Sequence, residues 1–482
     1  MTPFSFKGRV STAPEIRPLL NVGCLMDIPC GRYVKGKHGE WILNGGHALI
    51  TGVGGRGNTY KSTIAHHLNL TVLNRYFRSH ENVFDSEMSF TSGRAEQLSQ
   101  RMDFLAGVDL VEAERLVITD STVATGDKWF DELKEFSDIK LKEIKQSGGT
   151  TPFLQKDGTP YKYFVPSLAL VDSFSRMNFA STDAIFEKNS VGEAGMNMEA
   201  TRSSHAKNQL LIQVPVLTAS SGIYMTFTAH IDDSIQLDPY APVQKKLSLL
   251  KNGLKFKYVP AQFTFLMNNL WYCYDASPLM NQTTKAAEFP RSPSDNDPDN
   301  KDLMIVTLQN LRGKYGPSGS PFELIVSQSE GVLVGLSEFN YIRGYDRFGL
   351  GGNVQNYYLE LVPDISLSRT TIRSKIDANR KLQRALEITS ELCQLRNLYP
   401  RMFESVDGRR PILEWRTPKE IYECLKAKGY DWDILLEQTR GYWVFEEDDH
   451  PLHFLSTADI LEMCRSENAY RPWWYDEAAN KK

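Results

Sequence analysis

Short apolar runs recur between residues 46 and 335 of this 482-residue chain, and stretches with helical spacing of apolar residues separate most of them. Such an alternation predicts an α/β fold, in which helices cover a mostly parallel central sheet. The predicted strands are Ala48–Thr51, Asn82–Asp85, Arg115–Thr119, Ser167–Asp172, Gly222–His230, Gln262–Tyr272, Asp302–Leu308 and Phe322–Val326.

The regions on either side of this alternating pattern are different. Residues 1–45 are irregular and broken by prolines. Residues 336–482 contain a glycine-rich stretch, a long charged helix around Ser368–Arg396, and a helical segment that Thr417 caps and Gly429 ends. We therefore expect an N-terminal segment over residues 1–45, a core over 46–335, and a mainly helical C-terminal appendage domain over 336–482.

A glycine-rich segment, Gly-Val-Gly-Gly-Arg-Gly-Asn-Thr-Tyr-Lys-Ser-Thr at residues 52–63, lies between a predicted strand and a predicted helix over residues 64–73. A glycine-rich turn at a helix N-terminus points backbone N–H groups at an anion. We expect a phosphate-binding loop for ATP, with Lys61 on the β and γ phosphates, the Ser62 hydroxyl on Mg²⁺, and Tyr60 in place of the last glycine. The predicted nucleotide-binding residues are Gly55, Arg56, Gly57, Asn58, Thr59, Tyr60, Lys61, Ser62 and Thr63. An ordinary glycine-rich turn would explain the glycines but not the Lys-Ser-Thr sequence at the helix start.

Two carboxylates follow predicted strands. Asp172 ends an apolar strand, where it is placed to hold the water shell of Mg²⁺ beside the phosphate-binding loop. Glu87 lies just past Asn82–Asp85, and the carboxyl ends of parallel strands face the ligand crevice, so Glu87 is a candidate general base. Simpler interpretations are an acid at the exposed end of a buried strand for Asp172, and a helix first-turn acid for Glu87.

Two acidic motifs carry a resemblance to a known family. Phe-Asp-Ser-Glu-Met-Ser-Phe-Thr at residues 84–91, followed by Arg94, resembles the catalytic-glutamate segment of RecA-type recombinases. It is most similar to that of the UvsX-like recombinases of bacteriophages, which also carry an aromatic residue before the phosphate-loop lysine. Leu-Val-Asp-Ser at residues 170–173 resembles the second acidic motif of the same family. The resemblance covers residues 25–335 in order and implies a RecA-like P-loop ATPase core.

Two further segments extend the resemblance. Met-Thr-Phe-Thr-Ala-His at residues 225–230 resembles the strand that ends in the γ-phosphate sensor, so this role falls on His230; a buried structural histidine is the alternative. Residues 310–319 resemble the segment whose basic residues reach the ATP of the neighbouring subunit. Arg312 and Lys314 are the candidates for that role.

The resemblance also implies two DNA-binding loops, which fall on residues 189–208 and 231–257. Flexible basic loops that face the axis of a ring or filament follow a phosphate backbone without reading bases. The candidate DNA-binding residues are the basic ones, Arg202, Lys207, Lys245, Lys246, Lys251, Lys255 and Lys257, with His205 beside them. A solvated lysine-rich surface is the alternative, and Asp232 and Asp233 oppose DNA binding locally.

Composition and charge limit the classes of protein to which this chain can belong. The formal net charge of −4 and a pI near 6.2 argue against a globally basic nucleic-acid binder but leave a local basic groove open. No apolar run is long enough to cross a bilayer, and the chain start lacks the apolar core of a signal peptide. The six cysteines have no metal-ligand spacing. We therefore expect a cytoplasmic protein with reduced thiols and no membrane partner.

These features predict a DNA-dependent ATPase: an ATP-dependent, single-stranded DNA-binding recombinase of phage recombination, repair and replication. ATP and Mg²⁺ are expected between subunits of a homo-oligomer, either a filament or a hexameric ring. The expected catalytic residues are Glu87, Lys61, Arg312, Lys314 and His230.

Two alternatives to the recombinase remain. Ser-Glu-Met-Ser at residues 86–89 and Gly-Pro-Ser-Gly at 316–319 also resemble motifs of DnaB-like replicative helicases, which form rings. Tyr60 leaves open a RecA-fold scaffold that is weakened in catalysis. The C-terminal aromatic residues are expected to form the core of a small helical domain, with the near-terminal pair Trp473 and Trp474 as the exception, a tail that docks a replication or recombination protein.

Overall fold

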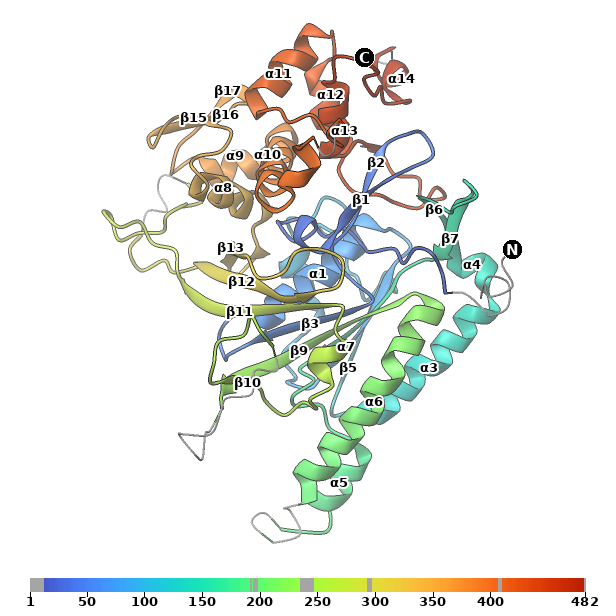
Figure 1. Cartoon of the computed structure of the whole chain (residues 1–482). Coiled ribbons are helices and arrows are strands. Elements are labelled where there is room, and N and C mark those ends of the chain that lie inside the picture. Colours follow the sequence, from blue (N-terminus) through green and yellow to red (C-terminus); the bar gives the residue numbers. More distant parts are fainter. Residues whose placement is uncertain are drawn as a thin grey trace.

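A large mixed β-sheet flanked by helices forms the centre of the molecule, and the C-terminal elements lie over one side of it (Figure 1). The structure, a computed structural model, describes residues 13–190, 193, 198–234, 247–292, 297–405 and 410–480. The expected α/β class is confirmed at this level.

The central sheet has a parallel half and an antiparallel half. In spatial order its strands are β14 (Gly331–Val332), β13 (Pro321–Ser327), β12 (Leu303–Gly313), β11 (Asn269–Pro278), β3 (Ile50–Gly55), β9 (Ile223–Asp233), β8 (Ser167–Asp172), β4 (His80–Asp85) and β5 (Leu116–Asp120), and β10 (Leu254–Phe256) pairs with β9. Neighbours from β11 to β5 are parallel, whereas those from β11 to β14, and the β9–β10 pair, are antiparallel. The sheet is therefore mixed rather than mostly parallel.

Each predicted strand coincides with an observed strand, with one internal difference. Within the predicted strand Gln262–Tyr272, residues Phe263–Leu266 form the short helix α7, and β11 begins only at Asn269. A short apolar run of this kind does not distinguish a strand from a helical turn by periodicity.

Helices cover both faces of the sheet. On one face α1 (Lys61–Arg75) packs against β3, β4, β8 and β9, and it also contacts α2 (Ser92–Ser99). On the other face α6 (Glu199–Ser221) packs against β3, β9 and α3 (Gly126–Lys142). Because α1 is enclosed by the sheet on one side and by other elements on the other, most of its side chains are buried.

The N-terminal region is more regular than expected from its prolines. Residues 32–44 form a hairpin of β1 (Arg32–Lys35) and β2 (Trp41–Asn44), and the 3-10 helix η1 (Ile28–Cys30) precedes it. The hairpin contacts the C-terminal region, since the Trp41 backbone N–H donates to Asp459 at 2.6 Å. A second hairpin, of β6 (Gly148–Leu154) and β7 (Pro160–Phe164), lies outside the central sheet.

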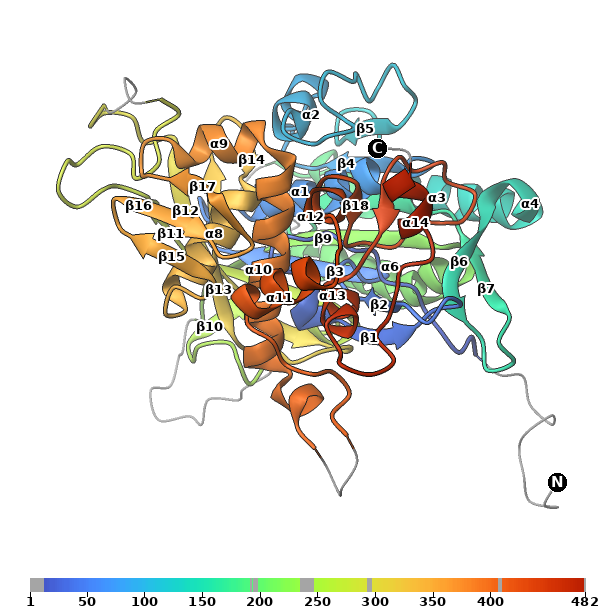
Figure 2. The ribbon, with the colours of Figure 1, turned by 90° about the horizontal axis from the view of Figure 1, so that it is seen from above.

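The C-terminal region combines helices with small sheets (Figure 2). Its glycine-rich stretch forms part of a three-stranded sheet of β15 (Leu350–Asn353), β16 (Asn356–Leu359) and β17 (Val362–Leu367). The predicted long helix is two helices, α9 (Ile372–Ala378) and α10 (Arg380–Leu398), because the Asn379 side chain between them caps α10 by accepting from Leu382 N. The other elements here are α8 (Val334–Gly344), η3 (Pro400–Phe403), α11 (Pro418–Ala427), α12 (Trp432–Glu437), β18 (Thr439–Arg440), β19 (His453–Phe454), α13 (Thr457–Met463) and α14 (Tyr475–Asn480).

One hydrophobic cluster extends from Leu20 to Ala478 and joins the sheet to the C-terminal elements. Thr417 caps α11 as expected, with Glu420 completing a capping box. In the described parts of the chain, no helix has the length and apolar character needed to cross a membrane.

Candidate nucleotide-binding site

A tight loop connects the central strand β3 to the helix α1. A Cβ on Gly55 would lie 2.3 Å from the Thr59 hydroxyl oxygen, so the loop requires glycine there. The Thr59 hydroxyl donates to the Arg56 carbonyl oxygen at 2.9 Å and closes the turn. No side chain caps the N-terminus of α1, and its first N–H groups therefore remain available to an anion.

Tyr60 holds an unusual backbone conformation at the start of α1. Its φ of 60° and ψ of 21° lie in the left-handed region, which glycine adopts freely and which costs other residues about 1–2 kcal/mol. Its ring is half-buried. The local geometry is therefore that of a glycine position occupied by an aromatic residue.

Lys61 is buried, and none of the described residues supplies a counter-ion for it. Its side chain is 7% exposed. Among the described residues it makes no hydrogen bond, and no carboxylate lies within 4.0 Å of its ammonium, although its charge acts on Glu87 and Asp172. A buried charge without a partner is costly, so this position favours an anionic ligand.

Asp172 lies at the end of β8 beside the first turn of α1. Its carboxylate accepts hydrogen bonds from Thr228 and from Ser62, and His66 Nε2 lies 3.8 Å from its Oδ2. Burial raises the pKa of Asp172, and it also lowers the pKa of His66 to about 3, so that the imidazole is neutral.

The donor set fits Mg²⁺ in one specific way. No cluster of three or more His, Cys, Asp or Glu residues that could enclose a metal occurs in the described chain. Mg²⁺ keeps several waters and is held by one or two protein oxygens together with the phosphates of its substrate. Ser62 and Asp172 supply oxygens of that kind next to the loop.

Glu87 and His230 meet at the same edge of the sheet. His230 Nε2 lies 3.2 Å from Glu87 Oε1, and the Ser173 hydroxyl donates to the same oxygen at 3.0 Å. The hydrogen bond from His230 lowers the pKa of Glu87 to about 2, against the opposite effect of burial, and the nearby Lys61 ammonium also lowers it. Glu87 is therefore an ionised hydrogen-bond acceptor at neutral pH.

Two residues that the sequence analysis did not single out fix the position of Glu87. The buried Asp85 carboxylate accepts the backbone N–H groups of Glu87, Ser89 and Phe90 at 2.9, 2.5 and 2.6 Å. The Ser86 hydroxyl donates to the Ser173 carbonyl at 2.8 Å and so ties the end of β4 to the end of β8. An Asp at a strand end, followed by a turn, is a signal of such side chain to backbone bonding.

The strand that ends at His230 also connects to the candidate DNA-binding region. The β9 strand continues to Asp233, which forms an exposed ion pair with Arg56 of the phosphate loop at 2.7 Å. On the paired strand β10, Lys255 lies opposite Asp232. The loop and the base of the second candidate DNA loop are thus in direct contact.

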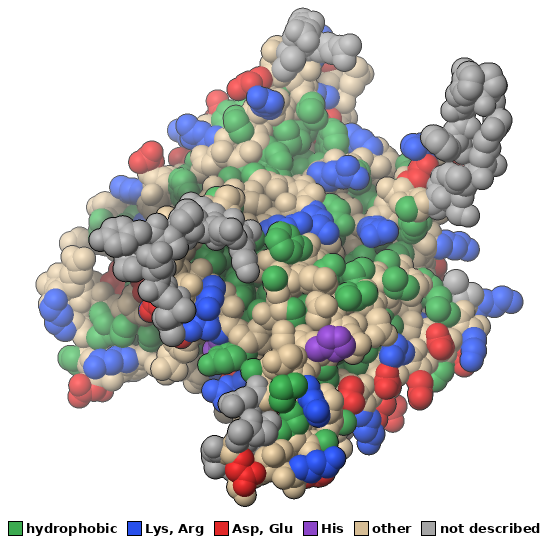
Figure 3. Space-filling model, turned by 60° about the horizontal axis from the view of Figure 1, so that its bottom comes forward, with side chains coloured by type: hydrophobic (Ala, Val, Ile, Leu, Met, Phe, Trp, Pro, Cys, Tyr) green, Lys and Arg blue, Asp and Glu red, His purple; other side chains and the backbone are tan. Residues whose placement is uncertain are grey.

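The candidate DNA-binding residues are not all placed alike. Arg202, His205, Lys251 and Lys255 are exposed, Lys257 lies 3.6 Å from Asp232, and Lys245 and Lys246 lie outside the described residues. On the face shown in Figure 3, Lys and Arg side chains are scattered among apolar ones and do not form one continuous patch.

The structure does not support the prediction that Lys207 binds DNA. It is 3% exposed, and its ammonium donates to the carbonyl oxygens of Ser175 at 2.8 Å and Tyr258 at 2.9 Å. Burial lowers its pKa to about 8. The ammonium is bonded inside the protein, and Lys207 is therefore unable to contact a DNA phosphate in this conformation.

Arg312 and Lys314 are not level with the end of β3 that leads into the candidate phosphate loop. Arg312 pairs with Leu270, which pairs with Gly52, three residues before Gly55 on β3. Three residues of a strand span about 10 Å, and the loop extends further in the same direction. Within one molecule these two residues are therefore set back from the loop along the strand direction.

The near-terminal tryptophans differ in exposure. Trp474 is buried and stacks on His453 at 4.5 Å, whereas Trp473 is 66% exposed and lies 5.0 Å from the His38 ring. The chain matches no protein-family model, and no curated protein matches it. The function is therefore argued from the geometry of the site.

Proposed function

We propose that this protein is a RecA-like P-loop ATPase that binds single-stranded DNA and acts as a phage-type recombinase in the cytoplasm. The observation that supports the proposal most strongly is the buried Lys61 ammonium, which lies at the first turn of α1 and has no acidic partner in the part of the chain that the structure describes. The phosphates of ATP supply the missing negative charge. The uncapped helix N-terminus supplies further N–H donors for the same group.

The arrangement of the strand ends supports the RecA-like core. The parallel strands β3, β9, β8 and β4 end side by side, and they carry the phosphate loop, His230, Asp172 and Glu87 at one edge. Ligands of open α/β sheets bind outside the carboxyl ends of such strands.

Each residue at this edge has a role in hydrolysis. Lys61 binds the β and γ phosphates, and Ser62 with Asp172 would hold Mg²⁺, which neutralises phosphate charge when bound. Glu87 accepts a hydrogen bond from the attacking water and orients it in line with the γ-phosphate. The negative phosphates raise the pKa of Glu87 from its low value, which makes it a better base when the substrate is present.

The position of Arg312 and Lys314 favours an oligomer. Arg312 is level with Gly52 rather than with the end of β3, so within one molecule it is set back from the loop, and its charge would serve the ATP of a neighbouring copy together with that of Lys314. A neighbouring copy that places its ATP against these two residues gains two cations for the transition state. ATP is then bound between subunits of a filament or ring.

His230 connects hydrolysis to DNA. It contacts Glu87 at the site, and β9 leads from it to residues 231–257, where Lys251 and Lys255 are exposed. Loss of the γ-phosphate would alter the contact of Glu87 with His230 and, through β9, the base of the DNA loop.

The test is ATP hydrolysis with and without single-stranded DNA. We expect DNA to stimulate hydrolysis, and we expect Glu87→Gln to bind ATP while its turnover falls by about 10²–10⁴-fold. Joint-molecule formation without directional unwinding of a forked duplex would separate a recombinase from a helicase. Absence of hydrolysis by the wild-type chain, with or without DNA, would contradict the ATPase.

A further inference from the structure

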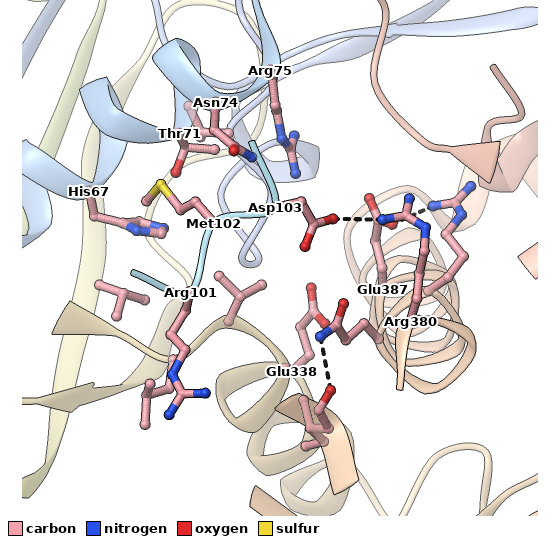
Figure 4. Close-up of a pocket in the computed structure, with 18 of the residues that line it drawn as sticks. His67, Thr71, Asn74, Arg75, Arg101, Met102, Asp103, Glu338, Arg380 and Glu387 are labelled. Atoms are coloured by element: carbon pink, nitrogen blue, oxygen red, sulfur yellow. Dashed lines mark hydrogen bonds and ion pairs between the residues drawn. The ribbon is translucent and has the colours of Figure 1, made fainter. Parts of the chain in front are cut away.

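A cavity lies at the C-terminal end of α1, between this helix, α8 and α10 (Figure 4). Its volume is about 210 Å³. This is room for about seven waters, and it is below the range of pockets for drug-sized ligands. None of the nucleotide-site residues lines it, and its size excludes a nucleotide.

Most of the charged groups around the cavity are paired within the protein. Five arginines line it: Arg75, Arg101, Arg380, Arg384 and Arg440. Arg101 pairs with Glu330 and Asp377, Arg380 with Asp103, and Arg384 with Glu387, whereas Arg440 donates to the carbonyls of Tyr442 and Leu452. These groups have satisfied partners without a ligand.

Among the described residues, Glu338 has no such partner, and Arg75 has only a long ion pair. Glu338 is 3% exposed, and in the part of the chain that the structure describes it has no hydrogen bond and no ion pair within 4.0 Å. The half-buried Arg75 guanidinium has one long ion pair, 3.7 Å to Asp27, and stacks 4.3 Å from the Tyr442 ring centroid, but it makes no hydrogen bond among the described residues. Figure 4 shows both residues on the cavity wall, Arg75 on α1 and Glu338 on α8.

The surroundings of Glu338 determine its charge. Burial raises the pKa of Glu338 well above its usual value, and the carboxyls of Glu387 and Glu391 raise it further, against the opposing charges of Arg75 and Arg384. These surroundings therefore favour the protonated form of Glu338. An ammonium group placed in the cavity would ionise it and release a proton.

We propose that this cavity binds a small zwitterion of the free amino acid class, with its carboxylate on Arg75 and its ammonium on Glu338. A zwitterion supplies an acceptor for the Arg75 guanidinium and a donor for Glu338, and it carries no net charge of its own. A simple anion would leave Glu338 without a partner, and a simple amine would leave the Arg75 donors without one. The ligand contacts the last turns of α1, the helix whose first residue is Lys61.

The first experiment is a binding screen on the full chain. Individual L-amino acids at millimolar concentration are tested by thermal unfolding and calorimetry, together with the decarboxylated and deaminated analogues of any that bind. We expect at least one amino acid to bind and both of its analogues to bind at least about tenfold more weakly, since each lacks one charge-assisted hydrogen bond. No binding by any amino acid, or equal binding by an analogue, would overturn the proposal.

The second experiment assigns the proton. Calorimetry of the same ligand in buffers of different ionisation enthalpy should show proton release on binding to the wild type. Glu338→Gln should remove that release and weaken binding, whereas Glu112→Gln, a change at an exposed carboxylate, should do neither. Binding to the wild type without proton release would overturn the assignment of the ammonium to Glu338, even if Glu338→Gln does not fold.

Discussion

The candidate phosphate loop and the α3–α6 layer each bury lysine side chains, but the partners of these lysines differ. In the α3–α6 layer, Lys140 donates to the carbonyl of Val165 at 2.6 Å and the hydroxyl of Ser167 at 2.7 Å, and Lys207 donates to two carbonyls. In the phosphate loop, Lys61 is buried to a similar extent and has no such partner among the described residues. A lysine with internal acceptors supports the fold, whereas a buried lysine without them indicates a place for an anion from outside.

The largest expected effect tests whether Arg312 of one subunit contacts the ATP that is bound to a second subunit. Arg312→Ala should lower turnover by about 10³–10⁵-fold, because a cation supplied in trans stabilises the transition state. Mixing inactive Arg312→Ala with inactive Glu87→Gln should restore activity at interfaces that combine the intact Glu87 of one subunit with the intact Arg312 of the other. With random mixing of equal amounts, about a quarter of interfaces are intact. A mixture as inactive as its components would show that Arg312 does not act between subunits.

Lys61→Met should weaken ATP binding without lowering the stability of the folded protein. We expect ATP affinity to fall by about 100-fold or more, which is the loss of one or two charge-assisted hydrogen bonds. We also expect the ligand-free protein to be at least as stable to urea as the wild type, because an unpaired buried charge has been removed. Strong destabilisation by this substitution would show that Lys61 has a structural role.

Lys140→Met is the matched control and should behave in the opposite way. The substitution leaves buried acceptors without a donor and should destabilise the protein by about 2 kcal/mol, with ATP affinity unchanged. Burial lowers the pKa of Lys140 from 10.5 to about 7, so between these values the unfolded chain binds more protons than the folded one. Its contribution to stability therefore rises from pH 7 to pH 10.5 and is lost as the pH falls again. Urea unfolding across this range should show the rise in the wild type and a flatter profile in Lys140→Met.

Tyr60→Gly should have the smallest effect. Glycine removes a left-handed strain of about 1–2 kcal/mol but adds unfolded-state entropy of about 0.4–1 kcal/mol, so the net stabilisation should be below about 1.5 kcal/mol. Hydrolysis should persist, and a change in nucleotide affinity would show that the ring contacts the ligand. Destabilisation in thermal unfolding would contradict the strain at this position.

Features that depend on residues close together in the chain, such as the ends of strands, could be predicted from the sequence. The strand ends that carry Lys61, Asp172, Glu87 and His230 were all predicted, because each follows a recognisable apolar run. The antiparallel half of the sheet was not, since strand direction depends on connections between distant segments. The break at Asn379 was also missed, because the charged pattern continues through it.

Side-chain partners from distant segments were the hardest to predict. Lys207 fits a basic DNA loop by position, but its acceptors lie 32 and 51 residues away in the chain and only folding brings them together. The same is true of the α1–α8–α10 cavity, where Arg75 and Glu338 meet from segments with no shared motif. By contrast, the contacts of Asp85 are local, and attention to strand-end turns would have found them.

The most direct measurement is a calorimetric titration of Mg–ATP into Glu87→Gln, repeated with Lys61→Met added to the same chain. Glu87→Gln prevents turnover during the titration and leaves the phosphate loop intact. We predict saturable binding of one ATP per chain in the single variant and loss of that binding in the double variant. Absence of binding in Glu87→Gln, or equal binding in both variants, would contradict the assignment of the residue 55–62 loop as the phosphate site.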